Sequence, residues 1–545
     1  MKNTTSRKNT HFLIYIAFLT LPFSTNVVSA FELPPSSDVL EPRSPENYQS
    51  TIFIKKITFT GNNKFSTEQL NKLTKHYENR PVSSEELETL RQDITKLYIN
   101  SGYVNSGAII PNQDIQNGAV NIKIIEGKLS NIKITGNESL ETDYLYQQLS
   151  LDQNNILSVS DIQDQIQIAL QSPLIEKIDA QLVPGEQLGE AELIASIKEG
   201  KQYEAKIDIN NRISPNVGEV RTSLYASALN VRGYADSLSA NLGYAEGLSN
   251  YGVNYQFPLF NSATRLELYY KFSTAEIVEQ DFDEISSKTW TNGFRFTLAS
   301  NFTRSRQLNS SVGIERRYNK TLIRDFCISY SSGVEEDCET HITALRLSQD
   351  MLFRNTQQVL ALRLTLSIGL DALGSTQNEG DLPSSKFYVL LGQAQFAQKF
   401  FKRQDQLVFR FDTQLSNDGL FSMEQFAVGG QLSVRGYREN QLLRDNGYTA
   451  SIEYRITTPL SLDNFKNRRL QAITFFDTGG AWFDEINRNN RDFIHLSSAG
   501  LGFRWEVVKK LESQFYWAYG FNSVETSSGN SIQDQGIHFS LQYSI

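Results

Sequence analysis

Most of the chain, from residue 203 to residue 545, alternates between apolar and polar residues in short segments. The segments 265–272, 360–368 and 537–545 are clear examples. Period-2 alternation gives a strand one apolar and one polar face. We count roughly sixteen such segments, an even number as in bacterial outer-membrane barrels. A soluble antiparallel sandwich also alternates, but apolar faces that lack charge over so many strands favour a transmembrane β-barrel with a polar lumen.

Length and charge narrow the class of protein. The 545 residues exceed one ordinary core and predict two or three domains. The net charge of -9 leaves no basic footprint for phosphate contacts, so no nucleic-acid partner is expected. After the N-terminus, no apolar run is long enough for a membrane-spanning helix. The 24 Tyr and 33 Phe would suit aromatic girdles at two membrane interfaces.

The N-terminus has the pattern of an export signal. Residues 1–30 combine basic residues, an apolar core over 12–23 and a small-residue cleavage motif that ends at Ala30. Residues 31–50 are rich in proline and predict an extended tether. An exported, acidic chain with alternating strands indicates the outer membrane of a Gram-negative bacterium.

Between the tether and the barrel, one pattern occurs twice. Ile57–Asn62 (ITFTGN) returns as Ile132–Asn137 (IKITGN). Each copy reads as strand, helix, helix, strand, and a repeat of this length can be a domain. We therefore predict two small α/β domains, over residues 51–128 and 129–202.

Three phrases in these repeats resemble a known family: Gly102–Val104, Pro111–Ile115 and Gln181–Glu186. They are similar to the POTRA domains of two-partner secretion (TpsB) transporters, the hemolysin and adhesin secretion-activator family of the POTRA-barrel superfamily. Two copies fit this family better than its relative BamA, which has five. The resemblance implies a mainly β fold, with a 16-stranded antiparallel transmembrane β-barrel preceded by two POTRA domains.

The predicted connections of the barrel also alternate. Short ones such as 232–235 and 509–510 are separated by longer ones such as 324–340 and 371–386. Short periplasmic turns and long extracellular loops are typical of such barrels. With the N-terminus in the periplasm, residues 417–446 form the sixth outside loop.

This sixth loop contains the glycine-framed stretch Gly429–Arg438, which is too polar to span a bilayer. Its arginine could fold back into a water-filled lumen. On spacing alone, an exposed loop with a solvated arginine is an equal alternative.

Two motifs of the superfamily bear on that choice. Four consecutive loop residues match its VRGY signature: Val434, Arg435, Gly436 and Tyr437. Three residues of a later strand match its F-x-D-x-G motif: Phe475, Asp477 and Gly479. The resemblance implies that Arg435 reaches into the lumen and pairs with Asp477. An arginine held there would favour a bidentate carboxylate partner, although Asp477 alone could be an ordinary lumen carboxylate.

The two cysteines, Cys327 and Cys338, lie in the predicted fourth outside loop. In an oxidising compartment, this spacing predicts a local disulfide that staples a long acidic loop.

We expect no enzyme, cofactor or metal site. The five histidines are scattered, and no nucleophile elbow, metal-ligand spacing or phosphate-binding glycine loop is present. The resemblance implies a transporter that moves a large exoprotein of the hemolysin, adhesin or contact-dependent toxin type to the cell surface without ATP. Its partners would be the unfolded exoprotein, bound through an N-terminal secretion domain, and outer-membrane lipid. A BamA-like insertase and a passive porin are the alternatives.

Overall fold

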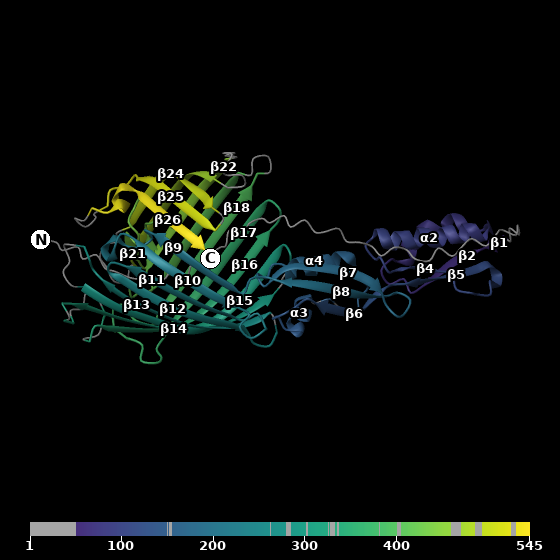
Figure 1. The fold of residues 1–545 in the computed structure, drawn as a ribbon, viewed down its shortest axis with the longest axis horizontal. Coiled ribbons are helices and arrows are strands. Elements are labelled where there is room, and N and C mark those ends of the chain that lie inside the picture. Colours follow the sequence, from purple (N-terminus) through teal and green to yellow (C-terminus); the bar gives the residue numbers. More distant parts are fainter. Residues whose placement is uncertain are drawn as a thin grey trace. The chain divides into compact units, whose positions relative to one another are not determined.

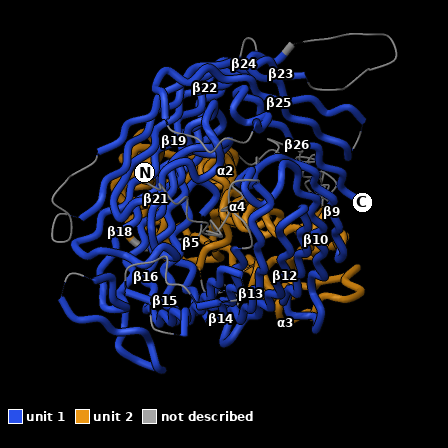
Figure 2. Tube along the Cα trace, turned by 90° about the vertical axis from the view of Figure 1, so that its left-hand side faces the viewer, with its two compact units in different colours: residues 1–21, 202–545 blue, residues 22–201 orange. Residues whose placement is uncertain are grey.

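The structure is a computed structural model that describes residues 51–149, 151, 155–261, 263–279, 285–300, 303–324, 326–327, 333–334, 337–380, 382–400, 405–458, 470–484, 493–508, 510–524 and 530–545. The predicted signal peptide (1–30) and tether (31–50) lie outside the described residues. The chain forms two compact units that meet in the sequence at Lys201 and Gln202, coloured orange and blue in Figure 2.

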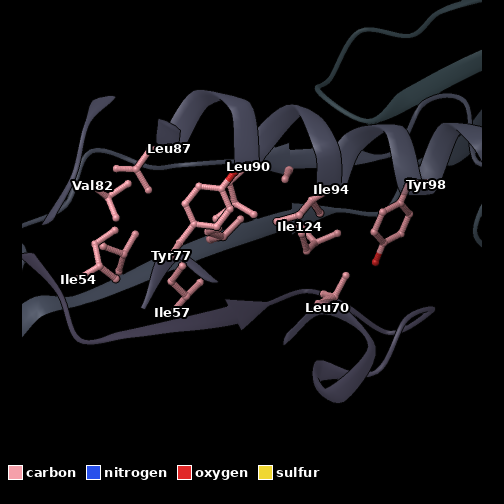
Figure 3. Close-up of a cluster of buried hydrophobic side chains, with 13 residues drawn as sticks. Ile54, Ile57, Leu70, Tyr77, Val82, Leu87, Leu90, Ile94, Tyr98 and Ile124 are labelled. Atoms are coloured by element: carbon pink, nitrogen blue, oxygen red, sulfur yellow. The ribbon is translucent and has the colours of Figure 1, made fainter. Parts of the chain in front are cut away.

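The first repeat is a small sheet covered by helices. Its elements are β1 (Ile52–Ile54), β2 (Lys56–Thr60), α1 (Thr67–Thr74), β3 (Arg80–Val82), α2 (Ser84–Asn100), β4 (Gly107–Ile109) and β5 (Ala119–Ile125). The sheet order is β2-β5-β4, with β2 parallel and β4 antiparallel to β5, while β1 pairs with β3. Figure 3 shows Leu90 and Ile94 of α2 directed toward Ile57 and Ile124 of the strands. These four side chains are at the centre of a closed apolar core.

The second repeat has the same plan. It consists of β6 (Lys128–Thr135), α3 (Thr142–Leu149), α4 (Val159–Ala169), β7 (Ile175–Pro184) and β8 (Glu190–Glu199), with sheet order β6-β8-β7. In the second repeat, the expected order of strand, helix, helix and strand lacks only β8. In the first repeat it lacks β3 and β4, which have three residues each, and β1 and β2 are two strands where we expected one. Among the described residues, no helix is long and apolar enough to cross a membrane.

The repeated glycine has a structural cause. Gly61 and Gly136 both have positive φ, +83° and +81°. An added Cβ would lie 2.4 Å from the Ile124 carbonyl oxygen at the first position and 2.5 Å from that of Ile197 at the second. Only glycine satisfies both constraints without strain, so the same residue follows β2 in the first repeat and β6 in the second.

The other unit, blue in Figure 2, is a closed antiparallel barrel of sixteen strands; its strands are drawn in Figure 1. The strands are β9 (Tyr203–Asn210), β10 (Arg221–Leu229), β11 (Ser237–Ala245), β12 (Leu248–Pro258), β13 (Thr264–Glu276), β14 (Ile285–Ser300), β15 (Arg306–Ile323), β16 (Glu339–Arg354), β17 (Gln358–Leu370), β18 (Tyr388–Lys399), β19 (Gln406–Ser416), β22 (Asn446–Thr458), β23 (Leu470–Trp482), β24 (Ile494–Val508), β25 (Leu511–Gly520) and β26 (Ile537–Ser544). Each pairs with the next, and β26 closes the barrel on β9. The predicted fold class is confirmed.

The two faces of the barrel strands differ as the alternation predicts. Outward-facing Leu242 and Leu501 are 54% and 61% exposed. The lumen face carries polar and charged side chains that pair with each other, such as Asp350 on β16 with Arg363 on the neighbouring β17. Charged side chains therefore line the lumen, and apolar side chains cover the outer face of the barrel.

Two connections of the barrel contain features that the sequence predicted. The one between β19 and β22, residues 417–445, contains the short antiparallel strands β20 (Phe426–Val428) and β21 (Leu442–Arg444). We call it loop 6. In the connection between β15 and β16, a disulfide joins Cys327 to Cys338, with the two Cα atoms 5.5 Å apart.

Candidate functional site

Arg435 of loop 6 is buried inside the barrel, with 1% of its surface exposed. Its Nε and Nη2 donate to the two carboxylate oxygens of Asp477 on β23, each at 2.7 Å. The Arg435 backbone N–H donates to the same carboxylate at 3.1 Å. Arg435 therefore lies inside the lumen. The exposed loop with a solvated arginine, which the spacing alone also allowed, is not what the structure has. The fork geometry of the guanidinium is what makes such a bidentate contact strong.

A second carboxylate and an aromatic ring complete the surroundings of Arg435. Its Nη1 donates to Glu453 at 2.8 Å and its Nη2 to the Ser451 hydroxyl at 3.1 Å, both on β22. The guanidinium carbon lies 3.5 Å from the centre of the Phe475 ring, a cation–π contact. A buried arginine is tolerated because its donors are satisfied and its charge is balanced.

The other three residues of the loop motif each have their own contact. Val434 is fully buried in an apolar cluster between loop 6 and the strands. Gly436 has φ +88° and donates its N–H to His538 Nε2 at 3.1 Å. The Tyr437 hydroxyl donates to the Ser497 carbonyl oxygen at 2.9 Å. All four motif residues therefore dock on the inner wall.

The strand motif supplies the other half of this contact. Phe475, Asp477 and Gly479 lie on the same face of β23, directed into the lumen. A Cβ at Gly479 would lie 2.9 Å from Val428 and 3.0 Å from Val434 of loop 6. The glycine leaves the space into which loop 6 packs.

Arg438 ties loop 6 to two other connections. Its Nε and Nη2 donate to Asp534, both at 2.6 Å, and its Nη1 donates to Glu279 at 3.0 Å. Asp534 lies between β25 and β26, and Glu279 follows β13. Gln533, the neighbour of Asp534, accepts the backbone N–H of Glu439 at 2.8 Å.

Loop 6 has a second charged anchor at Glu424. Its carboxylate accepts Arg346 Nη2 of β16 at 2.6 Å and lies 3.2 Å from Arg317 Nη1 of β15. Arg317 and Arg346 also pair with Glu315 of β15. β17, β18 and β19 lie between β16 and β22 around the barrel. Loop 6 is therefore held at two separated parts of the wall, by Glu424 and by Arg435.

The sequence did not assign roles to several residues of this site. Glu453 and Ser451 lie on the polar face of β22, and His538 lies on the polar face of β26. The alternation predicted that these side chains face the lumen, but it could not predict which residues they contact. Arg438 lies in the singled-out glycine-framed stretch. No sequence pattern predicted a role for Glu424, because its partners Arg317 and Arg346 are far from it in the sequence. Among the described residues, no group of three His, Cys, Asp or Glu could hold a metal ion.

Comparison with known proteins identifies the family. The model for the haemolysin secretion/activation proteins ShlB/FhaC/HecB matches residues 189–505, more than half of the chain. The chain belongs to this family. A second model, for the ShlB-type POTRA domain, matches residues 52–127, the first repeat. The resemblance to two-partner secretion transporters is confirmed.

Individual relatives are distant. The chain is 22% identical to the heme/hemopexin transporter protein HuxB of Haemophilus influenzae (strain 86-028NP), over 81% of this chain and 78% of that one. It is 21% identical to the outer membrane transporter CdiB of Escherichia coli O6:K15:H31, over 74% and 69%.

Two solved structures have the same fold. CdiB from Escherichia coli superposes with a TM-score of 0.67 at 17% identity, covering 93% of each chain. BamA from Haemophilus ducreyi, lacking POTRA domains 1–3, gives 0.55 at 14% identity, over 91% of this chain and all of the other. At these identities the likeness shows the fold alone.

Family membership gives the chain its function and its place. It is an outer-membrane transporter that translocates a secreted partner protein, with its POTRA domains in the periplasm and its barrel in the outer membrane.

Proposed function

We propose that the transporter captures its partner unfolded in the periplasm, through an N-terminal secretion domain of that partner, and passes it through the barrel lumen when loop 6 leaves its resting position. The Arg435–Asp477 contact holds that position. The observation that carries the proposal is a loop that occupies the lumen and is anchored there by a buried arginine. Transport is the only activity proposed, and no catalytic step belongs to it.

Sheet edges in the two repeats support the capture step. With sheet orders β2-β5-β4 and β6-β8-β7, each sheet has two outer strands. The longest of these is β7, with ten residues. An extended client segment that adds to such an edge gains backbone hydrogen bonds without needing a particular sequence. Such binding suits a client that arrives unfolded.

Energy for the transfer comes from the client. The periplasm supplies no ATP, and the sequence has no phosphate-binding loop. A client that folds at the cell surface cannot return, so folding outside gives the movement its direction. The outward-facing apolar side chains, Leu242 and Leu501 among them, contact outer-membrane lipid in this proposal.

The test compares the proteins in the culture medium of cells with and without this chain. Loss of one large protein, with other outer-membrane proteins unchanged, supports dedicated secretion and identifies the client, of hemolysin, adhesin or contact-dependent toxin type. An unchanged medium together with depleted outer-membrane barrels would instead indicate a BamA-like insertase. If neither changed, a passive channel would be the better description.

A further inference from the structure

The outer face of the barrel carries few charged residues, and most of them lie together. The alternation of each strand directs six charged residues of the sixteen strands away from the lumen. Two of them, Glu276 and Arg306, are the last residue of β13 and the first of β15. The other four lie on the consecutive strands β14, β15 and β16, which Figure 1 shows side by side: Lys288, Arg316, Lys320 and Glu339.

These four residues lie toward the cell surface. β9 begins at the periplasmic POTRA domains and neighbouring strands are antiparallel, so β15, the seventh strand, runs from the periplasm to the cell surface. The connection between β15 and β16 is therefore extracellular. Lys320 and Glu339 lie beside it, and Lys288 lies near the same end of β14. The four side chains thus face the outer leaflet of the membrane.

Strand register arranges the four residues around an aromatic row. Lys288 lies opposite Lys320, and Lys320 lies opposite Glu339. Arg316 lies on the same face of β15, four residues before Lys320. Between these two levels is a row of rings: Trp290, Tyr318 and His341. On the periplasmic side of Arg316 is an apolar row: Phe294, Ile314 and Leu345. Arg316 therefore lies where the hydrocarbon-facing surface meets the extracellular aromatic girdle.

Two of the three cations have no acidic partner in the part of the chain that the structure describes. Lys320 pairs with Glu339 at 2.8 Å, whereas Lys288 and Arg316 form no ion pair there. Arg316 Nε is buried and has no hydrogen-bond partner among the described residues. Like charges directly opposite each other repel, as at Lys288 and Lys320, and an arginine on a lipid-facing surface is unfavourable. An anion at this place would relieve both costs.

We propose that this surface of β14–β16 binds lipid A, the phosphorylated glycolipid of the outer leaflet, with one phosphate group on Arg316. The planar guanidinium matches phosphate oxygens in a bidentate contact. Lys288 supplies a second positive charge, on the other side of the ring of Trp290. The proposal rests on the location of the barrel in the outer membrane and is independent of how the client is captured or passed.

The apolar row argues for a lipid and against a soluble anion. Phe294 on the neighbouring strand is 45% exposed on the same face as Arg316, and Val312, four residues before Arg316, is 41% exposed. A molecule that carries both a phosphate group and acyl chains can contact the cation and this apolar surface together. The acyl chains would lie along the apolar row while the phosphate stays at the level of the girdle.

The experiment compares the full-length wild type with Arg316→Gln and Arg306→Gln. Arg306 is the matched control, because it lies on the same face of the same strand at the periplasmic end. Each protein is placed in phosphatidylcholine vesicles with or without bisphosphorylated lipid A. Heat-dependent gel mobility gives the temperature at which the barrel unfolds.

The expected effect of Arg316→Gln depends on the lipid. Without lipid A, the variant should be at least as stable as the wild type, because a charge has left the lipid-facing surface. Lipid A should raise the unfolding temperature of the wild type and of Arg306→Gln clearly more than that of Arg316→Gln. An equal rise in all three proteins would overturn the proposal and show an arginine that is only solvated. If Arg316→Gln fails to assemble, Arg316→Lys, which keeps the charge, should assemble and respond to lipid A.

Binding of lipid A by native mass spectrometry tests the role of the phosphate. Arg316→Gln should bind bisphosphorylated lipid A about tenfold more weakly than the wild type, since hydrogen bonds to charged groups are the stronger ones. Wild-type binding of dephosphorylated lipid A should be as weak as that of the variant. Equal binding of both lipids by the wild type would mean that the acyl chains alone are recognised. Stabilisation by inorganic phosphate equal to that by lipid A would mean a soluble-anion site; either result would overturn the proposal.

Discussion

The same hydrogen-bonded turn follows β2 in the first periplasmic repeat and β6 in the second. The asparagine after the glycine, Asn62 or Asn137, donates to the backbone carbonyl three residues on, at 3.0 and 2.9 Å. A carboxylate then accepts backbone N–H groups of the turn: Glu126 does so in the first repeat and Glu199 in the second. The six-residue repeat in the sequence therefore corresponds to the same turn in both domains.

Glu199 should make the second repeat sensitive to acid. Burial raises the pKa of its carboxyl, but hydrogen bonds from the Ser139 side chain and from the backbone N–H groups of Leu140, Ser139 and Glu138 outweigh burial and hold the pKa below its usual range. Because the folded-state pKa is the lower one, this stabilisation is present above the unfolded pKa of about 4.3 and is lost as pH falls through the folded value.

Hydrogen exchange of the amides of residues 138–140 in the full-length protein would measure this. After correction for intrinsic rates, protection should fall as the pH drops below the unfolded pKa. Glu199→Gln should lower protection at neutral pH by about ten- to a hundredfold, since hydrogen bonds to a charged group contribute about 1.5–3 kcal/mol. Protection in that variant should no longer depend on pH in the acidic range. A wild-type profile in Glu199→Gln would contradict the assignment.

Arg435→Ala should reduce secretion while the barrel still assembles. The change leaves Asp477 without its buried positive partner, whereas Glu453 keeps its ion pairs with Arg410 and Arg455. Breaking a buried pair costs about 3–5 kcal/mol. Secretion into the medium and the heat-dependent gel mobility of the barrel are the two measurements. Arg363→Ala is the control, because that lumen arginine pairs with Asp350 on the adjacent strand. Undiminished secretion by Arg435→Ala would show that the Arg435–Asp477 contact does not hold loop 6 in its resting position.

At the scale of elements, the position of loop 6 depends on contacts that are distant in the sequence. Its hairpin β20–β21 packs against β22 and β23, near Arg435, while Glu424 reaches β15 and β16. Two anchors at separated places restrain the loop more than either does alone, because release of one leaves the other to hold it.

Glu424→Gln should therefore loosen loop 6 without removing it from the lumen. The amide keeps the shape but not the charge between Arg317 and Arg346, so part of the pairing energy is lost. Single-channel conductance should show more frequent opening than in the wild type, and the double variant with Arg435→Ala should open most. Asp350→Asn alters a wall ion pair and serves as the control. If the double variant opened as rarely as the wild type, neither Glu424 nor Arg435 would set the position of loop 6.

The disulfide should act locally. Joining Cys327 to Cys338 closes a connection of the barrel rather than its core. Replacing both cysteines with serine removes a constraint that, for a loop of about 15 residues, is worth about 3 kcal/mol in chain entropy. We expect faster proteolysis between β15 and β16 and an unchanged heat-dependent gel mobility. A destabilised barrel would contradict this.

For the whole molecule, the two units have separate cores. The first repeat buries its own apolar cluster, and the barrel closes through β9 and β26 without any strand from the repeats. Removing residues 51–201 should therefore leave a barrel that still assembles. Secretion should fall to background, because the capture edges are lost. Fractionation with gel mobility tests the first expectation and the culture medium the second; secretion by the truncated chain would contradict the capture step.

The sequence by itself determined the barrel, because alternation with period 2 follows from strand geometry alone. It also pointed to both halves of the Arg435–Asp477 contact, through the resemblance of two short motifs to those of the superfamily. The tertiary structure decided the rest. Glu424 finds Arg346, and Arg438 finds Asp534, across 78 and 96 residues, and no local pattern carries that information. Strand register also places Asn241 of β11 opposite Gly252 of β12, a pairing that neither strand's own pattern specifies. Register depends on closing the whole barrel, since every strand pairing must agree with all the others.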